Sequence, residues 1–219
     1  MNNNLISFAK IYESIFNPIL KNDTGIDAES LTNLSLNLLS FCSDRKDWPL
    51  ISNVLEIIKN DLCIKDERLS QQICGINFMN PLGLAAGFDK NGIAASIWND
   101  FGFGFSEIGT ITQFSQPGNK KPRLFRDKSA KAIINRMGFN NKGVDYLVKQ
   151  IKKRKSDLPI GVSIGKNFET PNNLAVKDYL YCLDRVFEFA DYIAINISSP
   201  NTEGLRSFEA KIELENLIK

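Results

Sequence analysis

The 219-residue sequence contains no histidine, and this absence removes several classes of chemistry. Catalytic triads of the Ser-His-Asp type, Cys-His nucleophile pairs and histidine-ligated metal sites cannot be built from this chain. We therefore predict that the protein has no metal site of this kind and no histidine-activated nucleophile.

Three further features are missing. Cys42, Cys63, Cys74 and Cys182 lie too far apart for a CxxC motif, and we expect them to be reduced thiols in the cytosol. No apolar run has the length of a transmembrane helix, and the polar residues 1–4 do not look like the start of a secretory signal. Any contact with a membrane is therefore expected to be peripheral.

The charges of the chain are nearly balanced. It has 27 basic and 25 acidic residues, and the resulting net charge of +2 is too small to indicate a nucleic-acid partner. Hydrophobic residues make up 43% and charged residues 24%, which is typical of a folded globular protein and argues against disorder. The length fits one large domain, or one domain with a small appendage.

The first sixty-odd residues have the pattern of amphipathic helices, with apolar side chains three or four positions apart. Asp27 is placed to cap the second of these helices, and Pro49 falls in the first turn of the third. The apolar stripes cover residues 5–20, 31–41 and 51–62. They belong either to a packed core or to a surface that meets lipid or an apolar ligand. Residues 1–66 are thus predicted to form a helical extension.

From residue 67 onward, short apolar strands alternate with amphipathic helices, and this alternation predicts a parallel sheet. A small hairpin comes first, with strands at residues 69–71 and 76–78. The other expected strands cover residues 82–86, 105–108, 159–164 and 192–197. The expected helices cover residues 93–101, 144–154, 174–189 and 207–219, and a long excursion occupies residues 110–141.

Two parallel architectures compete, the open doubly wound sheet and the closed (β/α)8 barrel. Polar or glycine residues follow the end of every main predicted strand, as in a barrel whose active site is assembled from several strand ends. They lie at residues 87–90, 109–110, 165–167 and 196–199. A dinucleotide-binding sheet would instead carry a GxGxxG turn, which this sequence lacks. We therefore predict an α/β fold in which residues 67–219 form the first four βα units of a TIM barrel.

Three segments carry candidate binding groups. Residues 84–90 (LAAGFDK) combine small residues, which let a flat ring approach the backbone, with a lysine; the alternative is a simple tight turn. Residues 135–141 (NRMGFNN) offer amide donors and acceptors, or else form an ordinary loop. Residues 196–202 (NISSPNT) offer hydroxyls and amides, or else cap a helix. A serine base there would need water, Thr202 or an amide as its proton relay.

In this order, the segments resemble the dihydroorotate dehydrogenase family. The resemblance extends from about residue 69 to residue 206. Its motifs are NPLGLAAGFDK at 80–90, EIGT at 107–110, QPGN at 116–119, PR at 122–123, NRMGFNN at 135–141 and NISSPN at 196–201. It implies an FMN cofactor and the oxidation of dihydroorotate to orotate in pyrimidine (UMP) biosynthesis.

The resemblance also implies roles for individual residues. The implied FMN contacts are Ala86, Gly87, Phe88, Asp89, Lys90, Thr110 and Asn196. The implied substrate contacts are Lys90, Asn135, Arg136, Met137, Gly138, Phe139, Asn196 and Asn201. Ser199 takes the place of the catalytic base, which removes a proton from substrate C5 while a hydride passes from C6 to flavin N5; Thr202 and Phe139 fit its proton-relay surroundings. The flavin supplies the hydride chemistry and the protein supplies orientation and charge.

Ser199 also indicates the branch of the family, because soluble relatives carry cysteine there and quinone-linked relatives carry serine. The quinone-linked branch has a helical extension that forms a quinone channel at the membrane. The resemblance therefore implies a quinone acceptor and peripheral attachment to the cytoplasmic side of the cell membrane. Ser163 stands where the family pattern usually has an FMN-contacting asparagine, and we keep it as an expected contact, direct or through water.

Strands five to eight of a barrel are not found in this sequence, and the phosphate site of a TIM barrel usually follows strands seven and eight. The leading hypothesis is a quinone-linked dihydroorotate dehydrogenase. A half-barrel that serves only as a binding or partner module is the alternative, and a related FMN barrel acting on another pyrimidine is the third.

Overall fold

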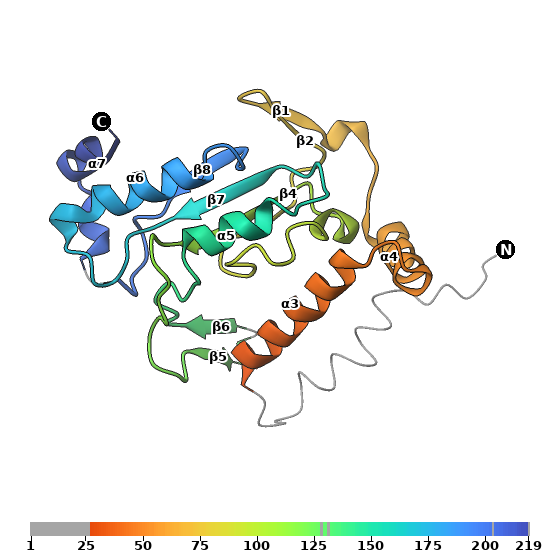
Figure 1. The fold of residues 1–219 in the computed structure, drawn as a ribbon, viewed down its shortest axis with the longest axis horizontal. Coiled ribbons are helices and arrows are strands. Elements are labelled where there is room, and N and C mark those ends of the chain that lie inside the picture. Colours follow the sequence, from red (N-terminus) through yellow and green to blue (C-terminus); the bar gives the residue numbers. More distant parts are fainter. Residues whose placement is uncertain (1–26, 128, 131, 203, 219) are drawn as a thin grey trace.

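The computed structural model describes residues 27–127, 129–130, 132–202 and 204–218 (Figure 1). The helix predicted at residues 5–20 lies outside the described residues. The helices are α3 (Ala28–Asp44), α4 (Pro49–Leu62), α5 (Val144–Ile151), α6 (Ala175–Val186) and α7 (Lys211–Ile218). The strands are β1 (Gln71–Ile73), β2 (Ile76–Phe78), β3 (Gly83–Leu84), β4 (Phe105–Ile111), β5 (Leu124–Asp127), β6 (Ala132–Asn135), β7 (Ile160–Ile164) and β8 (Tyr192–Ile195).

The central sheet contains the parallel strands β3, β4, β7 and β8, in that order. Each strand pairs with the next one along the barrel path, as expected of consecutive βα units. Strand β7 is buried along its whole length, and α5 and α6 lie along it (Figure 1). The predicted alternation of strands and helices is therefore confirmed.

Two apolar cores hold these elements together. The larger lies between the sheet and helices α5 and α6, with Ile108, Val162 and Leu147 fully buried. The smaller joins the extension to the barrel, because Leu36 and Leu55 belong to the same cluster as Ile97, Trp98 and Leu158. Helix α4 thus buries Ile51 and Leu55 of its predicted stripe, whereas α3 packs through Leu36 and leaves Leu34 and Leu38 of its predicted stripe exposed.

The starts of α3 and α4 follow from local chemistry. The Asp27 carboxylate accepts a hydrogen bond from the Ser30 backbone N–H at 3.1 Å, which satisfies one of the free donors of the first turn. Pro49 is the first residue of α4, where its missing N–H costs nothing. Both predictions are confirmed. No helix within the described ranges is long and apolar enough to cross a lipid bilayer.

The prediction of a helix at residues 93–101 is wrong. This segment consists of successive turns that end in the 3-10 helix Trp98–Phe101. Its backbone bonds connect residues three apart, as between the Ile97 N–H and the Ala94 carbonyl at 3.1 Å. The Asp89 carboxylate accepts hydrogen bonds from the Ile93 and Ala94 N–H groups, so these groups are satisfied by a side chain. Asp89 thus caps the first of these turns, and the segment does not continue as an α-helix.

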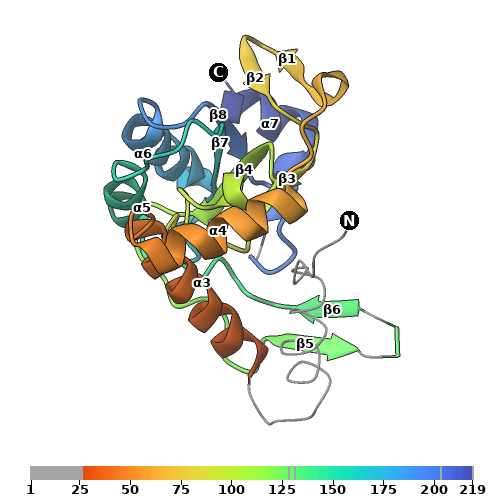
Figure 2. The same cartoon turned by 90° about the vertical axis from the view of Figure 1, so that its right-hand side faces the viewer.

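The long excursion contains secondary structure that the sequence analysis did not predict. It contains an antiparallel hairpin of β5 and β6, which stands apart from the central sheet beside α3 (Figures 1 and 2). The Asp127 carboxylate closes its turn by accepting bonds from the Ser129 and Ala130 N–H groups. Strand β6 is exposed along its length, with Ile133 and Ile134 both facing solvent. Without a buried face, the hairpin lacks the alternating pattern that identifies a strand.

The other boundaries differ by a few residues. The first hairpin strand begins at Gln71 rather than at residue 69, because Asp66 accepts a bond from the Arg68 N–H and starts the 3-10 helix Glu67–Leu69. Strand β3 covers only Gly83–Leu84, and Gly83 packs so closely on Phe105 that a Cβ atom would lie 2.2 Å from its ring. The remaining predicted strands and helices agree with the structure apart from their ends.

Candidate active site

A cavity of about 1010 Å³ lies beside the C-terminal ends of the central strands. It is lined by all of the predicted site residues except Arg136 and Ser163. Helix α3 forms another part of its wall through Thr32, Asn33, Leu36 and Asn37. The cavity therefore joins groups from the barrel and from the helical extension, and its volume suits a ligand larger than a single small metabolite.

The loop after β3 presents its backbone to the cavity. Gly87 has a φ of +104°, which a residue with a side chain rarely adopts, and a Cβ atom there would meet no protein atom within 4 Å. Its N–H donates to the Gly109 carbonyl at 2.8 Å, which holds the loop against β4. An open backbone of this kind allows close approach of a flat ring.

Asp89 fixes the same loop from beneath. Its side chain is fully buried and accepts hydrogen bonds from Ala94 N at 2.9 Å, Ile93 N at 3.0 Å and Trp98 Nε1 at 3.3 Å. Burial raises the pKa of the Asp89 carboxyl, and these donors oppose that effect because they stabilise the charged form. Asp89 thus lines the cavity, but its carboxylate is committed to the protein.

Lys90 follows Asp89 and supplies a cation to the cavity. Burial lowers the pKa of its ammonium group, since a charged amine loses hydration there. Glu29 opposes this shift and Arg123 adds to it, so both side chains act electrostatically on Lys90. A lysine in this position can face an anionic or electron-rich part of a ligand.

Thr110, Ser163 and Asn196 form a chain of hydrogen bonds across three strands. The Asn196 side-chain amide donates to Thr110 Oγ1 at 2.8 Å, and the Thr110 and Ser163 hydroxyls lie 2.9 Å apart. The pairing of β4 with β7 shifts register around Gly109, a position where a bulge redirects side chains. Thr110 and Asn196 reach the cavity.

Ser163 lies behind Thr110 and does not line the cavity. Only 2% of Ser163 is exposed, and its short side chain ends at the Thr110 hydroxyl. An asparagine at this position would extend further. The Ser163 hydroxyl thus contacts the Thr110 hydroxyl, and its contact with FMN, direct or through water, stays a prediction.

The segment at residues 135–139 forms a further part of the cavity wall and is held by amide side chains. Gln116 Nε2 donates to the Gly138 carbonyl at 3.1 Å, and Asn141 Nδ2 donates to the Phe139 carbonyl at 2.7 Å. Phe139 has a φ of +52°, so these bonds stabilise an uncommon backbone conformation. Asn135, Met137, Gly138 and Phe139 line the cavity as predicted.

Arg136 does not reach the cavity through its side chain. Its guanidinium donates to the Pro122 carbonyl from Nε at 3.3 Å and from an Nη at 3.0 Å, and the residue is exposed. These bonds turn the guanidinium toward the neighbouring loop, and the predicted substrate contact of Arg136 stays a prediction.

Ser199 lies on the loop after β8 and lines the cavity together with Asn196 and Asn201. Its hydroxyl oxygen accepts a hydrogen bond from the Asn201 N–H at 3.3 Å, which orients the side chain. Nearby in sequence, Thr202 is 4% exposed, and among the described residues its hydroxyl has no hydrogen-bond partner. The loop therefore holds one oriented hydroxyl and one buried hydroxyl that is free to bond to water or a ligand.

Three amide side chains brace the loops of the site. Gln116, Asn141 and Asn167 bond to one another's loops, and Asn167 Nδ2 donates to Gln116 Oε1 at 2.9 Å. Asn167 is one of the strand-end residues 165–167 that the sequence indicated, and Gln116 and Asn141 lie in motifs of the family resemblance. Nothing comparable indicated Glu29, because an acidic residue in the first turn of a helix is common for local reasons.

Comparison with known proteins decides the family. Residues 68–219 match the family model described as dihydroorotate dehydrogenase. The chain belongs to the dihydroorotate dehydrogenase family. The predicted resemblance is therefore confirmed.

The relatives and neighbours extend this result. The chain is 46% identical over 215 residues to a dihydroorotate dehydrogenase (quinone) of Prochlorococcus marinus, covering 95% of this chain and 55% of the relative. It is 58% identical over 147 residues to the protein of that name in Cellvibrio japonicus, covering 67% and 43%. The crystal structure of DHODH from Eimeria tenella in complex with ferulenol is similar with a TM-score of 0.71 and 39% identity, covering 85% of this chain and 49% of that one.

This chain thus spans about half the length of the curated relatives that it matches. The likeness to these structures and the strand order together show the predicted fold class. The dihydroorotate dehydrogenase fold is a TIM barrel with helices at its N-terminal side, and β3, β4, β7 and β8 are four of its strands.

Proposed function

We propose that the protein to which this chain belongs oxidises dihydroorotate to orotate with FMN, and passes the electrons to a quinone in pyrimidine biosynthesis. One observation carries the proposal: loops after β3 and β8 and the segment at residues 135–139 line a single cavity. No observation favours the alternative of a non-catalytic binding module. The names of the relatives support dihydroorotate and quinone as substrates.

The residues present fit the ring of FMN. The open backbone at Gly87 admits a flat ring, while Lys90, Thr110 and Asn196 offer polar groups to its edge. FMN, when bound, would accept the hydride from the substrate. The task of this chain is then to hold the ring and the substrate in contact and to exclude water from between them.

The substrate side of the cavity fits a small ring with alternating polar groups. Asn135, Asn196 and Asn201 line it, and an amide can both donate and accept hydrogen bonds. Ser199 would remove the proton from the substrate, and the buried Thr202 hydroxyl is available to relay it. Because the chain has no histidine, a hydroxyl relay of this kind is the route that its residues support.

Anaerobic addition of dihydroorotate to the FMN-loaded protein tests the function. We expect the visible flavin absorbance to bleach, and a quinone added afterwards should restore it. Dihydrouracil, which lacks the carboxylate, is the matched control and should not bleach the flavin at the same concentration. Bleaching by both compounds would contradict dihydroorotate as the substrate, and no bleaching by either would contradict the function.

A quinone partner and peripheral attachment to the cytoplasmic side of the cell membrane belong to the same proposal. One face of α3 packs in the core, but Leu34 and Leu38 on its other face are 66% and 58% exposed. At the end of α3, the Arg45 guanidinium lies 4.0 Å from the centre of the Phe41 ring. Apolar side chains with an adjacent cation suit the boundary between lipid headgroups and acyl chains.

Replacement of Leu34 and Leu38 with glutamine is expected to weaken binding to vesicles by about tenfold or more, because each leucine buried in lipid contributes about 1.5–3 kcal/mol. Turnover with a long-chain quinone should fall with it, while flavin bleaching by dihydroorotate should not change. Vesicle flotation and steady-state assays provide the measurements. Leu180→Gln is the control, since this leucine is 57% exposed on α6 of the barrel. Equal vesicle binding by all variants would contradict attachment through α3.

A further inference from the structure

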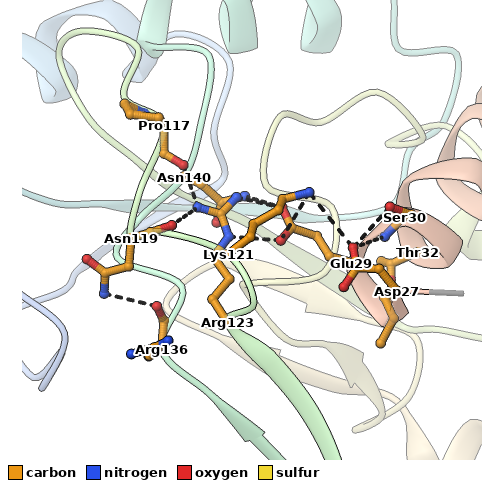
Figure 3. A network of polar contacts seen from close by, with 11 residues as sticks. Asp27, Glu29, Ser30, Thr32, Pro117, Asn119, Lys121, Arg123, Arg136 and Asn140 are labelled. Carbon is orange, nitrogen blue, oxygen red and sulfur yellow. Dashed lines mark hydrogen bonds and ion pairs between the residues drawn. The ribbon is translucent and has the colours of Figure 1, made fainter. Parts of the chain in front are cut away.

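A buried ion pair joins the helical extension to the loop before β5. Glu29 lies in the first turn of α3, and Arg123 lies 94 residues further along the chain. Arg123 Nε donates to Glu29 Oε2 at 2.8 Å, and Arg123 Nη2 donates to Glu29 Oε1 at 2.6 Å (Figure 3). The two side chains are only 6% and 7% exposed. A planar fork on a carboxylate fixes both distance and orientation.

The other edge of the Arg123 guanidinium holds a turn of the barrel. Nη1 donates to the Pro117 carbonyl at 2.5 Å and to the Asn119 carbonyl at 2.8 Å. Arg123 therefore connects α3 on one side to residues 117–119 on the other, as Figure 3 shows. A lysine could not do this, because its single ammonium group lacks the rigid fork.

This turn is in contact with the predicted substrate segment. The Asn119 N–H donates to the Met137 carbonyl at 3.0 Å, and its side-chain amide donates to the Arg136 carbonyl at 2.9 Å. Gly118 has a φ of +73°, and a Cβ atom there would lie 2.3 Å from the Met137 carbonyl oxygen. The Arg136 N–H donates in turn to the carbonyl of Arg123 at 2.9 Å.

Glu29 also acts on the cavity directly. It lines the cavity together with Arg123 and Asn140, and the Asn140 side-chain amide lies 3.5 Å from Glu29 Oε1. The hydrogen bond from Arg123 lowers the pKa of the Glu29 carboxyl, so the pair is ionised at neutral pH. Glu29 and Arg123 shift the pKa of Lys90 in opposite directions. The electrostatic effects of the two members of the pair on Lys90 therefore partly cancel.

We infer that Arg123 and Glu29 are positioning residues for the substrate: the ion pair and the turn at residues 117–119 set the geometry of residues 135–139. The inference rests on the proposed oxidation of dihydroorotate. Under this inference, the affinity for dihydroorotate depends on Glu29 and Arg123, which act through other residues. The same affinity is then linked to the packing of α3 against the barrel. By linkage, bound substrate should hold α3 more firmly.

The test compares Glu29→Gln and Arg123→Lys in the FMN-loaded protein. Glu29→Gln keeps the shape of the side chain and removes its charge, and Arg123→Lys keeps the charge and removes the fork. In each, the concentration of dihydroorotate that gives half-maximal rate of flavin bleaching should rise about tenfold, as expected for the loss of a charge-assisted hydrogen bond. The limiting rate of bleaching should change by less than about threefold, because the reacting groups remain.

Lys121→Gln is the matched control. Lys121 Nζ also lies near Glu29, at 3.7 Å, but its side chain is 53% exposed and no bond from it to the turn is present among the described contacts. Exposed ion pairs of this kind contribute little, so the half-maximal concentration should change by less than about twofold. An equal rise of the half-maximal concentration in Lys121→Gln and Glu29→Gln would contradict the inference. The loss of any charge near this site would then be enough to explain the effect.

Amide hydrogen exchange gives a readout that does not depend on activity. Glu29→Gln should accelerate exchange at the Asn119 and Arg136 amides and leave β7 unchanged. Acceleration of equal size in β7 would show a general loss of stability and contradict a positioning role, as would unchanged exchange at both amides. If dihydroorotate does not bleach the wild-type flavin, the proposed function fails, and exchange alone then decides whether the pair positions the segment.

Discussion

Replacing Ser199 with alanine is expected to slow flavin reduction by dihydroorotate by about 10²–10⁴-fold, the usual contribution of a positioned base. Ser199 lines the cavity, and its hydroxyl is oriented by the Asn201 N–H at 3.3 Å. The base acts on the substrate proton and has no part in retaining the flavin. The FMN content should therefore stay unchanged, and stopped-flow bleaching under anaerobic conditions measures the loss.

Ser199→Cys is the informative companion variant. A thiol can act as a base once it is ionised, with an ordinary pKa of about 8.5. We expect this variant to keep more activity than Ser199→Ala, with a rate of bleaching that rises as the pH increases through that range. Near-normal bleaching in Ser199→Ala would remove the serine from its proposed role, whatever the cysteine variant does.

Asp89→Ala is expected to lower the free energy of unfolding by about 3–5 kcal/mol, although Asp89 was predicted from the sequence as a cofactor contact. The fully buried carboxylate accepts bonds from Ile93 N, Ala94 N and Trp98 Nε1. Alanine would leave these three donors without their carboxylate acceptor, at a position where the side chain is fully buried. Urea unfolding followed by far-ultraviolet circular dichroism measures the change.

Two controls separate this effect from the loss of any carboxylate. Asp89→Asn keeps one acceptor oxygen, so its loss of stability should be smaller than that of Asp89→Ala. Asp145→Ala removes a carboxylate that is 64% exposed and forms one exposed ion pair, at 3.8 Å from Arg185. This change should lower the free energy of unfolding by less than about 0.5 kcal/mol. A loss below about 1 kcal/mol in Asp89→Ala would show that the three bonds do not support the fold.

The sequence by itself determined the features that depend on neighbouring residues. The Asp27 cap and the proline at the start of α4 follow from local hydrogen bonding and backbone geometry. The central strands follow from apolar runs, and their polar ends indicated the segments that line the cavity. Each of these signals is contained within a few residues, so it could be recognised before the fold was known.

Sequence signals are weaker where the structure of a segment depends on contacts with groups outside it. The segment at residues 93–101 has apolar spacing, but it folds as successive turns and a 3-10 helix in place of the predicted helix. The exposed β5–β6 hairpin has no buried face that would produce an alternating pattern. Ser163 follows the family position in sequence, but its side chain is too short to pass Thr110.

Only the tertiary structure decided how the extension meets the site. Glu29 and Arg123 are 94 residues apart, and neither has a local feature that identifies the other as its partner. Their ion pair exists because the barrel path returns the loop before β5 to the start of α3. The strength of such a pair depends on burial and on the exact orientation of the fork, which are properties of the folded chain and not of sequence spacing.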